Sequence, residues 1–345
     1  MKGSSKYIKF IALVLALVVT FLFADRLLSF KTIHGIRQAR DLYVQPRDTI
    51  DVAFLGSSHV HYDMNTAYLW ENFGIASYDY SAAEQPLWIT YYYLQELCKY
   101  QSPGLVVLDL YSPASFHDEY QYYYLTDNLN GVRFSKTKLD MIMASAEPDR
   151  IWDFFPSFVT WHLRYKELNK YDLEYLFMSK KERQAFKGFT PHFRNTYYEV
   201  PYYDFEHVTV LPPKTEEYLL KIIDYCKDNG IELYLVVNPY YIDSPEAGCY
   251  NRIKEIAAEQ GVRYENFNHW YDTMGLDFAT DLNDASHLNY EGSCKYSDFL
   301  GQVIKSLYDI PDRRGDERYE SWDRHAEYIR GQVERQDSED VNENN

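Results

Sequence analysis

A serine and an aspartate–histidine pair, far apart in the chain, have the residue types of a nucleophilic catalytic site. Ser58 follows an apolar run in the segment Phe54–His59, and Asp284 precedes His287 by one helical turn. A serine hydroxyl is a weak nucleophile at neutral pH, so it needs an adjacent base, and that base needs an orienting group. In the spacing Asp-x-x-His, Asp284 can hold one ring nitrogen of His287 and leave the other for Ser58. The sequence therefore predicts a Ser-His-Asp triad.

Strands that alternate with helices are expected to position these segments. Five short runs have the apolar pattern of buried parallel strands, namely residues 50–55, 75–80, 104–110, 231–237 and 262–267. Helices are predicted between them, at residues 86–100, 215–229 and 245–260, with a last helix after Tyr290. Gly230 and Gly261 end two of these helices, as C-terminal glycines commonly do. This alternation predicts an α/β fold, a doubly wound (flavodoxin-like) parallel sheet of about five strands.

Residues 112–212 break this alternation and are predicted to form an insertion after the third strand. The segment is rich in aromatic residues, lysine and arginine, and it contains no clear strand pattern. We expect it to be largely helical. Insertions at the carboxyl ends of parallel strands lie over the ligand crevice of such sheets, so this one is expected there.

The N-terminus has the pattern of a single membrane anchor. Three lysines within the first nine residues precede the apolar run Phe10–Ala24. Counting Tyr7 and Ile8 brings the run close to the roughly 20 residues that a spanning helix needs. Ala24 is an alternative cleavage position for a signal peptide, but Leu22 is a poor small-residue partner for it. We favour an uncleaved anchor with the N-terminus in the cytoplasm and the main domain outside the cell membrane.

These observations divide the chain into four parts. Residues 1–30 form the anchor, and residues 31–48 form a polar juxtamembrane linker with a short helix. Residues 49–310 form the α/β domain, which is long enough to bury one large core. Residues 311–345 are dense in charge and poor in aliphatic side chains, so we expect them to be disordered or to form a frayed helix.

Composition excludes several classes of function. The net charge of −17 and a pI near 5.0 argue against nucleic-acid binding, which requires a basic face. None of the four cysteines, Cys98, Cys226, Cys249 and Cys294, has C-x-x-C spacing, so a zinc site is not expected. Buried thiols are the simplest interpretation, and pairing in an oxidising compartment stays open. The 35 tyrosines suit a carbohydrate-facing groove, a membrane interface or the wet rim of a core.

His59, His61 and Asp63 are candidate metal ligands by residue type. No third ligand cluster accompanies them in the sequence. We therefore expect His59 to pack beside the serine turn, and we expect neither a metal nor another cofactor.

The segments Gly56-Ser57-Ser58-His59 and Asp284–His287 resemble the SGNH (GDSL-type) hydrolase superfamily. The Gly-Ser-Ser-His variant is similar to an envelope branch that includes the teichoic-acid D-alanylation protein DltD and polysaccharide O-acetyltransferases. The resemblance covers about residues 50–308 and implies that Ser58 is the nucleophile, His287 the base and Asp284 the orienting acid. Members of that branch also tend to have one N-terminal anchor.

The chain departs from this superfamily where the oxyanion hole is usually built. A second block usually provides a glycine, and here the matching stretch is Tyr80–Gln85, which makes Ser81, Ala82 and Gln85 the candidates. A third block usually provides an asparagine, and here Tyr111 follows the third strand. Asn238, at the end of the fourth strand, is a further ligand-contact candidate. Backbone amides can build an oxyanion hole, and the Ser58 N–H is the best single candidate.

Two classes of function remain. The first is an extracytoplasmic acyltransferase or esterase acting on O-acyl groups of cell-envelope glycans or teichoic acids. The second is a non-catalytic accessory protein of an envelope acylation system. In either case the expected partners are an envelope polymer, the membrane and a multi-pass membrane O-acyltransferase. The intact Ser, His and Asp favour the enzyme, and the altered oxyanion blocks favour the accessory protein.

Overall fold

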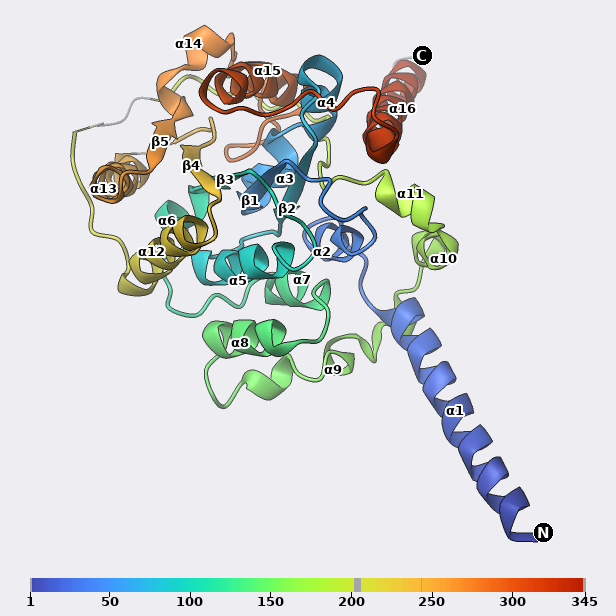
Figure 1. Cartoon of the computed structure of the whole chain (residues 1–345). Coiled ribbons are helices and arrows are strands. Elements are labelled where there is room, and N and C mark those ends of the chain that lie inside the picture. The colour runs from blue at the N-terminus through green and yellow to red at the C-terminus, as the bar shows by residue number, and fades with distance from the viewer. Residues whose placement is uncertain (1, 202–205, 243, 344–345) are drawn as a thin grey trace.

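The computed structural model describes residues 2–201, 206–242 and 244–343 (Figure 1). Its centre is one parallel sheet with the strand order β2-β1-β3-β4-β5. The strands are β1 Val52–Gly56, β2 Ser77–Ser81, β3 Leu105–Asp109, β4 Glu232–Val237 and β5 Arg263–Asn266. This is the flavodoxin-like order, in which the direction of winding reverses between β1 and β3. The predicted fold class is confirmed, and each predicted strand lies within about two residues of an observed one.

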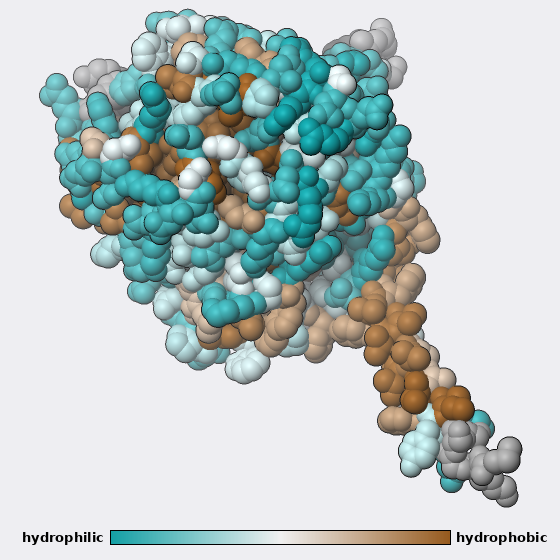
Figure 2. Space-filling view, in the orientation of Figure 1, coloured by the Kyte–Doolittle hydropathy of each residue, from teal (hydrophilic) through white to brown (hydrophobic). Residues whose placement is uncertain are grey.

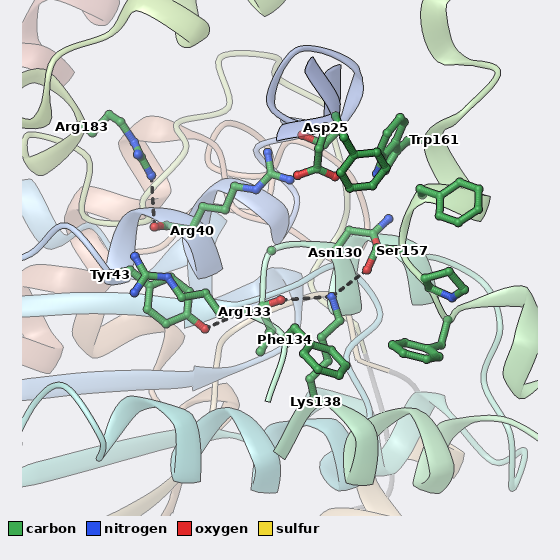
Figure 3. A pocket seen from close by; sticks show the side chains of 17 residues that line it. Asp25, Arg40, Tyr43, Asn130, Arg133, Phe134, Lys138, Ser157, Trp161 and Arg183 are labelled. Atoms are coloured by element: carbon green, nitrogen blue, oxygen red, sulfur yellow. Dashed lines mark hydrogen bonds between the residues drawn. The ribbon is translucent and has the colours of Figure 1, made fainter. Parts of the chain in front are cut away.

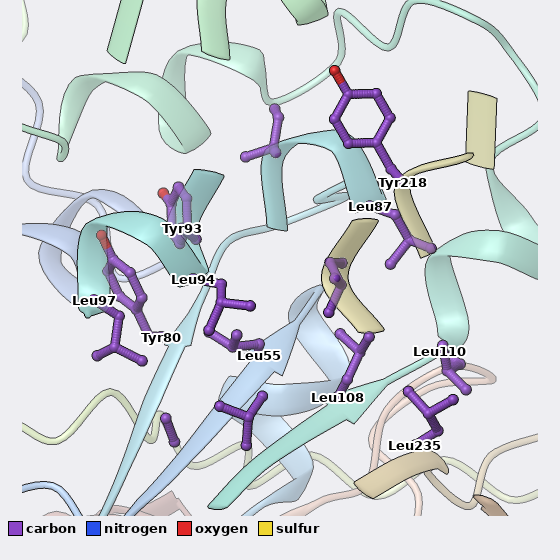
Figure 4. Packing of buried hydrophobic residues seen from close by; sticks show 14 of the residues in the cluster. Leu55, Tyr80, Leu87, Tyr93, Leu94, Leu97, Leu108, Leu110, Tyr218 and Leu235 are labelled. Carbon is purple, nitrogen blue, oxygen red and sulfur yellow. The ribbon is translucent and has the colours of Figure 1, made fainter. Parts of the chain in front are cut away.

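Helices cover both faces of the sheet, and the sheet separates the core into two clusters. The helices α4 Thr66–Phe73 and α15 Tyr290–Leu307 pack on one face, and α5 Leu87–Leu97, α12 Pro213–Asp228 and α13 Ser244–Gln260 pack on the other. Successive side chains of a strand point to opposite faces. Phe54 therefore packs with Leu300 of α15, whereas Leu55 packs with Leu94 of α5 (Figure 4).

The insertion after β3 is helical in its described part. Its helices are α6 Tyr111–Ser115, α7 Leu125–Asn130, α8 Lys136–Ser145, α9 Phe158–Trp161, α10 Lys170–Phe177 and α11 Lys180–Gln184. An extended segment then contacts β2, the helical segment after β1 and the start of α15. There Thr190 N–H donates to the His61 carbonyl at 2.7 Å, and Tyr290 N–H donates to the His192 carbonyl at 2.6 Å.

The N-terminal helix α1, Lys2–Leu28, projects away from the domain (Figures 1 and 2). Its stretch Lys6–Leu28 contains 18 residues with a mean hydropathy of 2.5 and is long and apolar enough to cross a membrane, properties that a signal sequence shares. Its C-terminal end is tied to the domain by two hydrogen bonds. Arg26 donates to the Leu176 carbonyl at 3.0 Å, and Arg164 donates to the Leu28 carbonyl at 3.2 Å.

The predicted juxtamembrane linker is instead part of the core. Residues 36–42 form the helix α2, Ile36–Leu42, whose side chains are almost all buried. Gln38 is fully buried and donates to the Gly188 carbonyl at 3.1 Å, and buried Asp41 accepts from Arg183 at 2.7 Å. The polar character of this segment reflects hydrogen-bonding partners in the insertion, which the local sequence does not reveal.

Of the two alternatives expected for the C-terminal tail, disorder is wrong for the described residues and a helix is observed. Residues 320–343 form α16, Glu320–Glu343, which packs on α4, and residues 344–345 lie outside the described residues. Trp322, Ala326 and Ile329 are buried at helical spacing on one face. The indole N–H of Trp322 donates to the Ser77 carbonyl at 3.0 Å. An apolar stripe of three side chains thus orders a helix that is otherwise highly charged.

Replacing Trp322 with alanine is expected to lower the free energy of unfolding by about 3–5 kcal/mol, because it empties a fully buried site. Urea unfolding of the full chain in a non-ionic detergent measures this change. The matched control is Trp152→Ala, since that indole is 68% exposed and its loss should cost about 0.5 kcal/mol or less. Equal, small effects of both substitutions would show that α16 contributes nothing to stability.

Candidate active site

A sharp turn after β1 presents Ser58 at the carboxyl end of the sheet. Gly56 has φ +147°, and a Cβ there would lie 2.9 Å from Val60 Cγ2 and 3.1 Å from the Asp109 carbonyl oxygen. Glycine is therefore required both by its backbone conformation and by the close approach of β3. The helix α3, Ser58–Asp63, begins immediately after the turn. Ser57 is fully buried, whereas Ser58 is partly exposed, so Ser58 is the accessible hydroxyl of the pair.

The fold brings Ser58, His287 and Asp284 together. Ser58 Oγ lies 2.8 Å from His287 Nε2, and His287 Nδ1 lies 2.9 Å from Asp284 Oδ1. An ionised carboxylate only accepts hydrogen bonds, so Nδ1 carries the hydrogen and Nε2 is free to accept from the serine hydroxyl. Both distances are within the range of a general base and its orienting partner.

The loop before α15 holds Asp284 in its ionised form. Asp284 accepts the backbone N–H groups of Ser286 and His287 at 2.9 and 3.1 Å, and the side chain of Asn283 donates to it at 2.8 Å. Partial burial opposes ionisation. The hydrogen bonds and the charge of His287 outweigh it, so the pKa of the Asp284 carboxyl lies well below its ordinary value. Asp284 is consequently a carboxylate at any pH near neutral.

A second carboxyl group fixes the loop to the serine helix. Asp63, at the end of α3, is fully buried and accepts the Leu288 N–H at 2.9 Å. Burial raises the pKa of Asp63 well above its ordinary value. This contact links the elements that carry Ser58 and His287, which are separated by 229 positions in the chain.

Rings enclose His287 on several sides. The ring centroids of Tyr62, His59 and His192 lie 5.0, 5.3 and 6.0 Å from that of His287. Burial lowers the pKa of His59 well below its ordinary value, and burial together with the His287 charge lowers that of His192 to about 4. His59 and His192 are therefore neutral near pH 7. As expected, His59 packs beside the serine turn, where its ring stacks on that of Tyr111 with a centroid separation of 3.8 Å.

Sequence analysis missed three side chains around the site, namely His34, Tyr62 and His192. Tyr62 O–H lies 2.5 Å from His34 Nδ1, which comes from the segment that joins α1 to α2. Tyr62 follows Ser58 by four residues, so a helix predicted directly after Gly56 would have placed both on one face. His34 and His192 lie in irregular segments, and their local sequence carries no signal of this position.

The three candidates from the second block have other partners. Ser81 Oγ lies 2.9 Å from His61 Nδ1, and Gln85 donates to Thr90 Oγ1 at 2.9 Å. Ala82 is fully buried against Gly35. Between the described residues, no hydrogen bond joins these side chains to Ser58 or His287.

Asn238 and Tyr111 have different positions. Asn238 is fully buried, donates to the His59 carbonyl at 3.1 Å and accepts from Tyr296 at 2.7 Å. It therefore positions the serine helix and does not line the crevice as expected. Tyr111 is partly exposed and its hydroxyl lies 3.3 Å from Ser286 Oγ, so it remains a candidate for substrate contact. The Ser58 N–H also remains a candidate oxyanion donor, since amides of a first helical turn lack intrahelical acceptors.

Within the described residues, no group of three or more His, Cys, Asp or Glu side chains is arranged to hold a metal ion. Cys98, Cys226, Cys249 and Cys294 are free thiols, either buried or half-buried.

Neither a protein-family model nor a curated protein matches the chain. Several solved structures are similar to it. One, from Bacteroides fragilis and provisionally assigned as an acylhydrolase, has 14% identity and a TM-score of 0.41 over 80% of this chain and 98% of that chain. A GDSL-like lipase from Bacteroides thetaiotaomicron has 12% identity and a TM-score of 0.39, covering 80% of this chain and 100% of that one. A gut microbial diltiazem-metabolizing enzyme has 10% identity and a TM-score of 0.38, covering 76% of this chain and 49% of that chain.

Proposed function

We propose that this protein is a membrane-anchored serine acyltransferase or esterase of the SGNH type. The observation that carries the proposal is the 2.8 Å contact between the partly exposed Ser58 hydroxyl and His287 Nε2, with Asp284 on the opposite ring nitrogen. A surface hydroxyl that forms no part of a site has no need of such an oriented base. The arrangement has the three roles that acyl transfer to serine requires.

The reaction follows from these roles. Ser58 Oγ attacks the acyl carbonyl while His287 Nε2 takes the hydroxyl proton, and Asp284 stabilises the resulting imidazolium. Backbone amides, including the Ser58 N–H, stabilise the oxyanion. The tetrahedral intermediate collapses as His287 returns the proton to the leaving alcohol, which leaves an ester on Ser58. Water or a second hydroxyl group then attacks that ester, and His287 acts as base again.

The expected membrane topology and the aromatic side chains near the site support the proposed substrate class. The proposed acyl acceptor or donor is a cell-envelope glycan or teichoic acid, on which O-acyl groups are carried by sugar or polyol hydroxyls. The lysines before α1 favour a cytoplasmic N-terminus, which places the domain outside the membrane, where such polymers lie. Partly exposed aromatic rings such as Tyr111 suit the apolar faces of sugars. A multi-pass membrane O-acyltransferase is the proposed partner for transfer.

Fluorophosphonate labelling followed by peptide mass spectrometry tests the proposal. We expect one covalent adduct on Ser58, because its hydroxyl is accessible and has a base. The matched control is Ser57→Ala, which should label at nearly the native rate, since the Ser57 hydroxyl is fully buried. An adduct on Ser57 would move the nucleophile by one residue. A folded native protein that never labels would favour the accessory-protein hypothesis.

A further inference from the structure

A cavity of about 560 Å³ lies where α1 meets the globular domain, and it shares no lining residue with the catalytic site (Figure 3). Phe21 and Asp25 of α1 form one wall, and Trp161 of α9 lies against Phe21 with a ring separation of 6.4 Å. Arg40 of α2 and Lys138 of α8 project from other sides. The cavity is thus built jointly by the membrane helix, the α2 segment and the insertion.

The lining of this cavity is strongly cationic. Its charged side chains are one carboxylate, Asp25, and four cations, which are Arg40, Arg133, Lys138 and Arg183. Arg183 is paired with Asp41 at 2.7 Å, and Arg40 points toward Asp25. Among the described residues, no carboxylate forms an ion pair with Arg133 or Lys138. The cavity therefore has two cations without a carboxylate ion pair, and the Arg133 guanidinium lies 4.2 Å from the centroid of the Tyr43 ring, which also lines the cavity.

Lys138 is the more constrained of the two. It is only 3% exposed, and its ammonium donates to the Val132 carbonyl at 3.0 Å and to Ser157 Oγ at 3.1 Å. Both acceptors are neutral, and burial lowers the pKa of Lys138 to about 8. Asp25 favours the charged form of Lys138, but burial and the charge of Arg40 outweigh it, and burying an ammonium group without an ion-paired carboxylate is costly. An anion in the cavity would offset that cost.

The surface around the cavity is aromatic and apolar. Phe134 and Trp152 are each 68% exposed, and Phe158 is 43% exposed. Figure 2 shows apolar surface along α1 and on the part of the domain beside its base. Aromatic side chains next to arginine and lysine are typical of the level of lipid headgroups. Asp25 follows the long apolar part of α1, so the cavity lies where the hydrocarbon layer would end.

We propose that this cavity binds the phosphate headgroup of an anionic phospholipid in the membrane that α1 enters. The inference rests on the anchor in the proposed function and assigns the domain a lipid contact besides α1. Arg133 and Lys138 bind the phosphate oxygens, while the exposed aromatic side chains contact the upper acyl chains. The membrane source is favoured over a free anion because one wall of the cavity is α1 itself.

Binding of short-chain lipids to the full chain in an uncharged detergent tests the proposal. The probes are dioctanoyl phosphatidylglycerol, dioctanoyl phosphatidylcholine and inorganic phosphate, followed by microscale thermophoresis. Phosphatidylglycerol should bind best, and Arg133→Gln should weaken it by about tenfold, as expected for loss of one charge-assisted contact. Lys138→Met should do the same if circular dichroism shows it folded. The control is Lys136→Gln, which removes an exposed lysine of the same helix that pairs with Asp140 outside the cavity.

The remaining outcomes contradict the inference. Equal binding of the two lipids would exclude a site for an anionic headgroup. Binding of phosphatidylglycerol that Arg133→Gln leaves unchanged would exclude a headgroup site in this cavity. Inorganic phosphate binding as tightly as phosphatidylglycerol would show a free-anion site instead. Fluorophosphonate labelling of Ser58, measured on the same samples, separates these failures from failure of the proposed catalytic function.

Discussion

Replacing His287 with alanine is expected to abolish fluorophosphonate labelling of Ser58 and to lower ester turnover by about 10⁶-fold. His287 Nε2 is the base that lies 2.8 Å from the serine hydroxyl in this structure. Without it the hydroxyl must lose its proton to water during attack. Loss of the base in dissected Ser-His-Asp enzymes is about as severe as loss of the nucleophile. Turnover of p-nitrophenyl acetate by the full chain, together with adduct formation, measures the effect.

The control for this prediction is His117→Ala, which removes an exposed histidine outside the site. Its turnover and labelling should equal those of the native protein. Thermal unfolding of both variants tests whether the His287 substitution disturbs the fold, because its ring packs near Tyr62 and His59. A folded His287→Ala variant that still labels Ser58 at the native rate would remove His287 from the mechanism.

Replacing Asp284 with asparagine is expected to lower turnover by about 10⁴-fold, a smaller loss than that from His287→Ala. The amide of asparagine can donate a hydrogen bond to His287 Nδ1. The ring hydrogen then lies on Nε2, and a protonated Nε2 cannot accept the proton of the Ser58 hydroxyl. The variant also lacks the charge that stabilises the imidazolium. The Asp284 side chain is 44% exposed and is hydrogen-bonded to His287, so it acts on the reaction through the His287 ring. We therefore expect kcat to fall, with little change in KM.

Asp272→Asn is the matched control, since it removes an exposed carboxylate of the nearby helix α14, Tyr271–Met274. It should leave both constants unchanged. A loss of less than about tenfold in Asp284→Asn would mean that Asp284 does not orient the base, given the far larger effect in known triads. A rise in KM with constant kcat would instead assign Asp284 to substrate binding.

The sequence alone was sufficient to predict the strands of the sheet and the helices that cover it, and to single out the candidate catalytic residues. Buried strands have apolar runs, and helices end at residues such as Gly230, so both signals are local. The pairing of Asp284 with His287 is also local, because three residues of a tight loop separate them. Gly56 marks the turn that exposes Ser58, since its φ of +147° favours glycine.

Only the tertiary structure decided how the flanking segments are used. Gln38 and Lys187 look like surface residues in the sequence, yet both are fully buried. Lys187 donates to Gln45 and Ser321 at 2.7 Å each and lies 3.6 Å from the Trp322 ring centroid. Polar side chains are buried where distant partners satisfy them. Those partners, in α16 and before β1, lie more than 130 positions away, beyond any local pattern.

The tertiary structure also decided which side chains surround the candidate triad. The sequence provided Ser58 and His287, but their contact joins positions 229 residues apart and depends on the order in which the strands pair. His34 and His192 reach the site from irregular segments, and Asn238 turns inward to hold the serine helix. Local sequence determines which residues have the right chemistry. Packing of the whole chain determines which of them meet, because each contact is fixed by backbone elements that only the complete core holds in place.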